Sequence, residues 1–178
     1  MKKINKSLLI KITFVCFLSA CLIGCGYSFT LRGDSIDNRI QKVYVEAFIN
    51  KTAQAEIENY FRTAFINQFI QNSRFKVVSS AEDADAIVRG KILNLNTSPL
   101  SYAKSGLAAE ERATVTLDLT FEDTANSKII WSSKNMASSI DYSLNEDINL
   151  LPSARKQALR KLANDMAEKA FNLMMSGF

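Results

Sequence analysis

The sequence predicts a single α+β domain in which two helices pack on a four- to five-stranded sheet of mainly antiparallel or mixed pairing. One observation is the alternation of apolar and polar residues over 113–122, which is typical of a strand with one wet face. The other is the three- and four-residue spacing of apolar residues over 57–69 and 159–174, which is typical of amphipathic helices that cover a sheet.

The first half of the domain is predicted from residue types. Residues 42–48 are rich in β-branched and aromatic side chains and predict a strand, after which Asn50, Lys51 and Thr52 supply a helix start signal. The helix ends at 71–73, and its apolar face comprises Ile57, Tyr60, Phe61, Ala64, Phe65 and Phe69. We expect this face to be core, with a ligand groove as the alternative.

Shorter elements follow. Strands are predicted over 75–78 and 86–95, joined by a turn at 79–85, and Gly90 predicts a bulge or a close backbone approach in the second strand. Residues 96–112 form the one long irregular stretch, and because stretches above about 12 to 15 residues are usually functional or disordered, partner contacts are expected there.

The second half contains the clearest patterns. The alternating strand is followed by a turn at 123–127 and a strand over 128–139 centred on Trp131. Leu151, Pro152 and Ser153 begin a second helix, whose apolar stripe is formed by Leu159, Leu162, Ala163, Met166, Ala167, Ala170, Leu173 and Met174. The charges on its other side have both signs, which favours packing on the sheet over lying on a membrane surface.

The chain begins with a pattern typical of a secretion leader. Four lysines and no acids in the first eleven residues precede an apolar run over 12–23, which is shorter than the roughly 20 residues of a spanning helix. The run ends in Leu22-Ile23-Gly24-Cys25, which resembles the lipobox of bacterial lipoproteins. The resemblance implies a signal peptide over 1–24, acylation of Cys25 by fatty acids such as palmitate, and a mature domain over 25–178. Cys21 ends a similar site, but cleavage there leaves a shorter apolar run.

The leader also accounts for the positive charge of the chain. Removing it takes away four of the 22 Lys and Arg residues, and the 18 that remain equal the 18 Asp and Glu residues. The mature domain therefore offers no argument for nucleic-acid binding. Cys16 and Cys21 leave with the leader and Cys25 is acylated, so no disulfide is expected.

The residue types disfavour an enzyme. The chain has no histidine, which removes Ser-His-Asp and Cys-His activation and every His-containing metal site. Glu82, Asp83 and Asp85 form the densest acidic cluster, but it lacks the glycine and the final Glu of a calcium loop. No glycine-rich phosphate loop is present either. We expect no cofactor, no metal site and no catalytic residue.

A series of motifs runs along the mature chain: Cys25-Gly26-Tyr27-Ser28-Phe29 with Arg32-Gly33; Val43-Tyr44-Val45 with Phe48 and Asn50; Ala84-Asp85 before Gly90-Lys91-Ile92; Tyr102 before Ala109-Glu110; and Ile129-Ile130-Trp131 before Asp141-Tyr142. Together they resemble the lipopolysaccharide-assembly lipoproteins, the LptE-like plug component of the outer-membrane lipopolysaccharide translocon. The resemblance implies an outer-membrane lipoprotein on the periplasmic side of a Gram-negative cell. Gly26, where inner-membrane lipoproteins carry Asp, agrees with that destination.

The resemblance implies the partners as well. Such a protein plugs an LptD-like β-barrel translocon, helps it assemble, and binds lipopolysaccharide without a covalent step. Cationic side chains near loop and strand ends pair with the lipopolysaccharide phosphates, which carries over to Lys104 and, second, to Arg112.

Two alternatives remain open. The pattern from Val43 to Gly90 also resembles periplasmic lipoproteins that activate a cell-wall synthase or form part of a secretion channel. The Tyr102–Arg112 stretch and the Trp131 hairpin favour the translocon family. An envelope hydrolase would require an unexpected carboxylate pair.

Overall fold

A mixed sheet organises the fold. The structure is a computed structural model that describes residues 36–102, 106, 108–144 and 151–177. The elements are β1 (Lys42–Val45), β2 (Ile49–Asn50), α2 (Ile57–Gln71), β3 (Lys76–Val77), β4 (Ala86–Tyr102), β5 (Ala108–Asp123), β6 (Ile129–Ser143) and α3 (Leu151–Ser176). The strand order is β3-β1-β4-β5-β6, with β2 also paired to β4. The α+β class is confirmed, and the sheet has six strands instead of four or five because the short β2, which was not predicted, pairs with β4.

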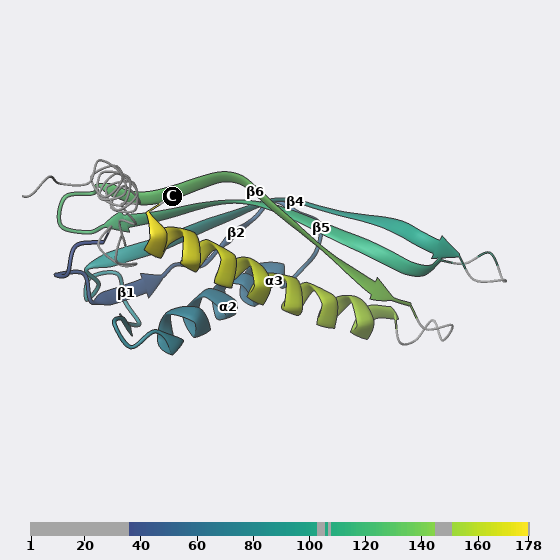
Figure 1. The fold of residues 1–178 in the computed structure, drawn as a ribbon, viewed down its shortest axis with the longest axis horizontal. Coiled ribbons are helices and arrows are strands. Elements are labelled where there is room, and N and C mark those ends of the chain that lie inside the picture. Colours follow the sequence, from purple (N-terminus) through teal and green to yellow (C-terminus); the bar gives the residue numbers. More distant parts are fainter. Residues whose placement is uncertain (1–35, 103–105, 107, 145–150, 178) are drawn as a thin grey trace, which may run out of the picture. The chain divides into compact units, whose positions relative to one another are not determined.

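Strand direction divides the sheet in two. β1 pairs in parallel with β3 and β4, and β2 pairs in parallel with β4. β4, β5 and β6 form an antiparallel meander, whose far part extends beyond the short strands (Figure 1). We call this far part, residues 94–102, 108–116 and 137–143, the distal meander.

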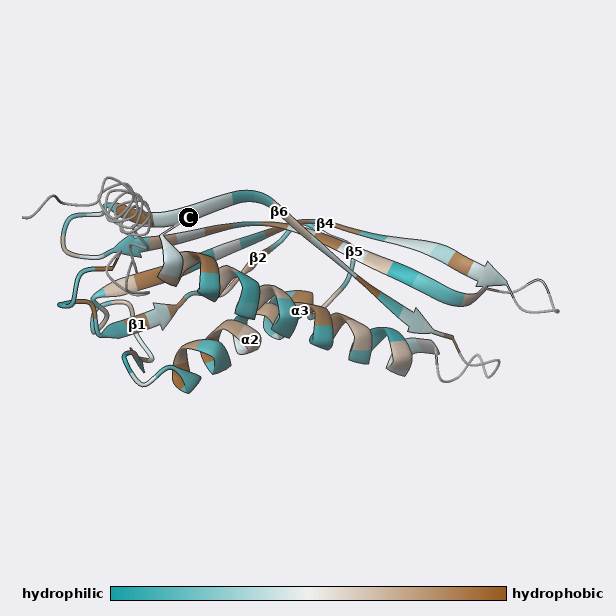
Figure 2. Cartoon of the chain, in the orientation of Figure 1, coloured by the Kyte–Doolittle hydropathy of each residue, from teal (hydrophilic) through white to brown (hydrophobic). Residues whose placement is uncertain are grey.

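Both helices cover the same face of the sheet (Figure 1). Hydrophobic and hydrophilic residues alternate along both helices (Figure 2). The core contains the predicted strand face and helix faces, with Val115, Leu117, Phe121, Phe65 and Leu162 all at most 1% exposed. The aromatic face of α2 is therefore core, as predicted, and α3 packs its apolar stripe inward.

The start of α2 differs from the prediction. The helix begins at Ile57, not at residues 50–52. The Asn50 side chain accepts the Thr52 amide at 2.8 Å and donates to the Glu58 carboxylate at 2.8 Å. Asn50 therefore holds a turn that leads into the helix, and Glu56 before the first helical residue takes a left-handed φ of 64°.

The prediction that residues 96–112 are irregular is wrong for most of these residues. β4 continues to Tyr102 and β5 begins at Ala108, with Asn96 opposite Thr114 and Ser98 opposite Arg112. Beyond the core both faces of these strands carry polar or exposed residues, so the alternation that marks a half-buried strand is absent. Backbone pairing to the neighbouring strand forms the hairpin without that pattern.

Gly90 is the site of a close approach. A Cβ built on Gly90 would lie 2.0 Å from Cε1 of the Phe48 ring, which is 4% exposed. The irregularity in β4 lies farther along, between Ile92 and Asn94. Of the two predicted causes for this glycine, the close approach is the correct one.

Two aspartates stabilise the end of the sheet next to β1 through hydrogen bonds and an ion pair. Asp85 accepts the backbone amides of Lys42 at 2.8 Å and Gln41 at 3.0 Å, and these bonds hold the pKa of Asp85 below its ordinary value. Asp123 is 3% exposed and pairs with Arg39, which lowers the pKa of Asp123. Both carboxylates stabilise the fold in their ionised form.

Stability should therefore fall at acid pH. The unfolded chain has ordinary aspartate pKa values of about 3.9 and takes up protons before the folded chain does. Asp85 contributes fully to the free energy of unfolding at pH values above the unfolded-state pKa. This contribution is lost as the pH falls through the lower pKa that Asp85 has in the folded protein. We expect urea midpoints to drop between pH 6 and pH 3, and less so in Asp85→Asn. An equal drop in Asp85→Asn would contradict this origin.

Candidate partner and ligand surface

No described element covers the face of the sheet opposite the helices, and the side chains on this face are mostly polar. Register places on it Arg89, Asn94, Asn96, Arg112, Thr114, Thr116, Thr120, Ser132, Ser139 and Asp141. We call this surface the open sheet face. The Thr114 and Ser139 hydroxyls lie 2.9 Å apart across two strands. Hydroxyl and amide groups can replace their hydrogen bonds to water by hydrogen bonds to a partner's polar groups. The open sheet face is therefore suited to binding a partner with a polar surface.

Ion pairs cross the open sheet face at two places. Near β1, Arg89 donates to Glu46 at 2.7 Å and also pairs with Glu122. In the distal meander, Arg112 donates to both carboxylate oxygens of Asp141, at 2.6 and 2.8 Å. The hydrogen bond from Arg112 lowers the pKa of Asp141, so this pair is fully ionised at neutral pH.

The predicted site residues fall in different places. Cys25 and the predicted leader lie outside the described residues, as does Lys104. Arg112 lies on the open sheet face in the distal meander. Its partner Asp141 was not predicted, because the two are adjacent only through strand pairing.

The far end of β4 exposes apolar side chains. Leu100 is 43% exposed and Tyr102 is 66% exposed. They are available to a partner or to an acyl chain.

On the helix side, a polar network joins the distal meander to α3. The Tyr142 hydroxyl donates to Glu111 at 2.5 Å, and Arg155 donates to Glu111 at 3.1 Å and to the Tyr142 hydroxyl at 3.2 Å. Burial, followed by the bond to Glu111, raises the pKa of Tyr142. No sequence pattern marks this network, because its members come from β5, β6 and α3.

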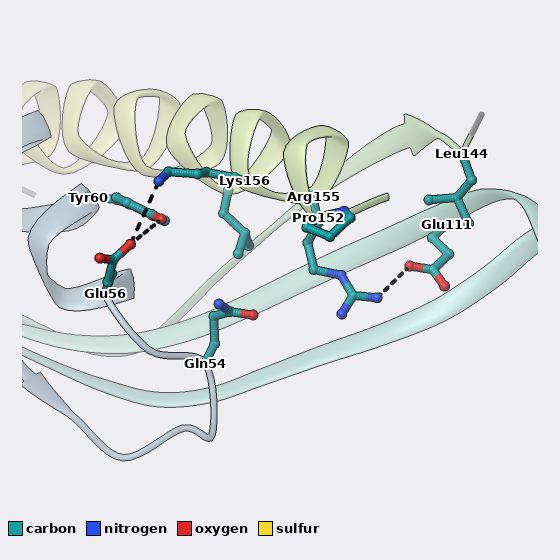
Figure 3. A pocket seen from close by; sticks show the side chains of 9 residues that line it. Gln54, Glu56, Tyr60, Glu111, Leu144, Pro152, Arg155 and Lys156 are labelled. Atoms are coloured by element: carbon teal, nitrogen blue, oxygen red, sulfur yellow. Dashed lines mark hydrogen bonds and ion pairs between the residues drawn. The ribbon is translucent and has the colours of Figure 1, made fainter. Parts of the chain in front are cut away.

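A pocket of about 430 Å³ opens beside this network, between the start of α3 and the segment before α2 (Figure 3). Arg155 and Glu111 line one end, and Lys156, Glu56 and Tyr60 line the other. Its charged groups are largely paired with one another.

Within the described residues, the structure contains no cluster of three potential metal ligands, and every fully buried side-chain polar atom has a hydrogen-bond partner. In the same ranges no helix is long and apolar enough to cross a membrane.

The fold has relatives among solved structures. The structure of "a putative lipoprotein from Caulobacter crescentus CB15" is 11% identical over 73% of this chain and 88% of that chain, with a TM-score of 0.50. The PelC dodecamer from Paraburkholderia phytofirmans is 14% identical over 78% of this chain and 88% of that chain, with a TM-score of 0.50. At such identities the likeness shows the fold alone.

Comparison with curated proteins finds no match. The model of the lipopolysaccharide-assembly family, LptE, matches residues 40–174, which span β1 to nearly the end of α3. The match covers well over half of the chain and agrees with the family that the sequence motifs resemble. The chain belongs to the LptE family of lipopolysaccharide-assembly proteins.

Proposed function

We propose that this protein is a lipid-anchored component of the outer membrane that plugs a β-barrel translocon, helps it assemble, and binds lipopolysaccharide during export to the cell surface. The family match over residues 40–174 carries the proposal. No catalytic step is part of it. The protein acts by occupying a partner and by contacting the lipid.

The open sheet face supports the role of a plug. Barrel lumens are lined by polar side chains, so a domain that fills one needs a surface of hydroxyl, amide and paired charged groups. The threonines, asparagines and ion pairs of the open sheet face provide such groups on a rigid sheet. An LptD-like barrel is the partner that this chemistry and the family favour.

The anchor accounts for delivery. Acylation at Cys25 would attach about two or more chains, each contributing roughly 0.8 kcal/mol per buried methylene, which holds a protein stably on a bilayer. The domain itself then needs no spanning helix. In this proposal the anchor places the domain on the periplasmic side of the outer membrane.

Lipopolysaccharide contact is assigned to the distal meander. Lys104 belongs to the segment that joins β4 and β5, and Arg112 lies on β5 close to that segment. A phosphate would replace Asp141 as the partner of Arg112, while Leu100 and Tyr102 offer apolar contact beside it. Phosphate and acyl chain would therefore meet matching groups at one end of the domain.

The experiment that tests the proposal measures lipopolysaccharide binding by the mature protein and its variants. We expect Lys104→Glu and Arg112→Gln each to weaken binding about tenfold, because each removes a charge-assisted contact. Lys169→Glu, a charge change on the exposed side of α3, serves as the control and should bind like the parent. Unchanged binding in both distal variants, with folding intact by circular dichroism, would remove this site.

A further inference from the structure

A second polar groove lies between the two helices, away from the open sheet face. It has a volume of about 480 Å³. Two rows of side chains line it at four-residue spacing, Asn59, Thr63 and Asn67 from α2 and Lys156, Arg160 and Asn164 from α3. We call it the interhelical groove. The four-residue spacing places each row along one side of its helix, so the rows face each other across the groove.

Both helices that form the groove are packed into the hydrophobic core. Ala64, 4% exposed, lines the groove from α2, and buried residues of α3 belong to the same core. Two helices fixed to one core hold the polar rows at a constant separation. A ligand would therefore meet a preformed site and pay little for ordering it.

The lining combines groups that suit polyhydroxyl compounds. The Asn59, Asn67 and Asn164 amides each offer donors and an acceptor, and the Thr63 hydroxyl offers both. Tyr60 adds an aromatic ring, with the Arg160 guanidinium 5.3 Å from its centroid. Sugars are bound by such sets, because hydroxyls need both donors and acceptors and the ring faces stack on aromatic groups.

The charges in the groove favour an anion. Lys156 lies 3.7 Å from Glu56, a loose contact between two side chains that are about half exposed. Arg160 has no carboxylate within ion-pair distance among the described residues and rests on the Tyr60 ring. The groove thus contains two cations and one acid, with the guanidinium available for a bidentate contact.

We propose that the interhelical groove binds a phosphorylated saccharide, with the phosphate on Arg160 and Lys156 and the sugar hydroxyls on the asparagines and Thr63. This proposal deepens the proposed function. It rests on that function where the ligand is lipopolysaccharide. The phosphorylated sugar belongs either to lipopolysaccharide or to a soluble sugar phosphate. The site is separate from Arg112, which lies on the open sheet face.

The test compares two adjacent cations of α3. Arg160 lines the groove and Lys161, also exposed, does not. Binding of deacylated lipopolysaccharide, glucose 6-phosphate, glucose and inorganic phosphate to the mature protein is measured by calorimetry and amide chemical shifts. We expect Arg160→Gln to weaken binding of phosphorylated saccharide at least about fivefold and Lys161→Gln to leave it unchanged. Glucose should bind far more weakly, and inorganic phosphate should bind less tightly than the sugar phosphate.

The outcomes separate this site from the proposed function. Lipopolysaccharide binding that Lys104→Glu weakens and Arg160→Gln leaves unchanged overturns the groove site and keeps the proposed function. Glucose 6-phosphate binding that depends on Arg160, with no binding of lipopolysaccharide, supports the groove and contradicts the proposed function. Equal effects of Arg160→Gln and Lys161→Gln, or no binding of any phosphorylated saccharide, overturn the groove site.

Discussion

Replacing Phe69 by alanine is expected to lower the free energy of unfolding by about 3–5 kcal/mol, the range for removing a buried phenylalanine. Phe69 is 0% exposed, and its ring lies 5.4 Å from Phe75, 5.9 Å from Phe121 and 5.1 Å from Phe171, measured between centroids. These neighbours come from three separate parts of the chain. The cavity would open where α2, α3 and the sheet meet, so it cannot close by a local shift.

The neighbouring residue supplies the control for this prediction. Ile70 is 61% exposed, so Ile70→Ala removes little buried surface and should change stability by less than about 0.5 kcal/mol. Urea unfolding followed by circular dichroism measures both variants. Similar losses in the two would show that this helix does not pack through the face that contains Phe69.

The second large effect is expected at Gly90. Gly90→Ala should cost about 1–3 kcal/mol, because a Cβ there would overlap the Phe48 ring. The ring has little room to move, since it packs 6.1 Å from the Phe61 ring and 5.4 Å from the Phe65 ring. The expected loss runs against the general preference for alanine over glycine within a strand.

A double-mutant cycle isolates this contact. Phe48→Leu removes the overlapping ring edge and should cost stability by itself, but Gly90→Ala should cost less in its presence than in the parent. Unfolding in urea gives the coupling free energy. Additive losses would mean that the Phe48 ring is not what excludes a side chain at residue 90.

The elements that the sequence predicted best are those with one buried side. In β5 every second residue is buried in the core, and in α2 and α3 every third or fourth residue is. Apolar residues therefore recur in the sequence with the period of a strand or of a helix. The predicted stripe of α3 is the buried stripe, with Leu173 only half-buried and Phe171 buried beside it. Periodicity therefore located these elements and oriented them.

Elements whose form depends on neighbours could not be predicted in this way. The part of the distal meander over 96–102 and 108–112 has no buried residue, so strand pairing alone extends β4 and β5 there. The start of α2 is set by the contacts of Asn50 with Thr52 and Glu58, and not by a cap at the predicted residue. Both differences arise from hydrogen bonds, which produce no periodic pattern of apolar residues in the sequence.

The candidate site was predicted only in part for the same reason. The family resemblance pointed to Arg112, but its partner Asp141 is 29 residues away and comes beside it through β-pairing. The Glu111, Tyr142 and Arg155 network and the interhelical groove each combine residues from distant segments. Spatial sets of this kind become visible only once the fold is known.

The most direct measurement of the central claim is site-specific photocrosslinking in cells, followed by purification from detergent-solubilised envelopes. A photoreactive residue at Thr116 on the open sheet face is predicted to crosslink to the β-barrel of the lipopolysaccharide translocon, whereas one at Glu168 on the exposed side of α3 should crosslink to it much less. Crosslinks from Thr116 to a cell-wall synthase or to a second copy of this chain, or none to any barrel, would contradict the account.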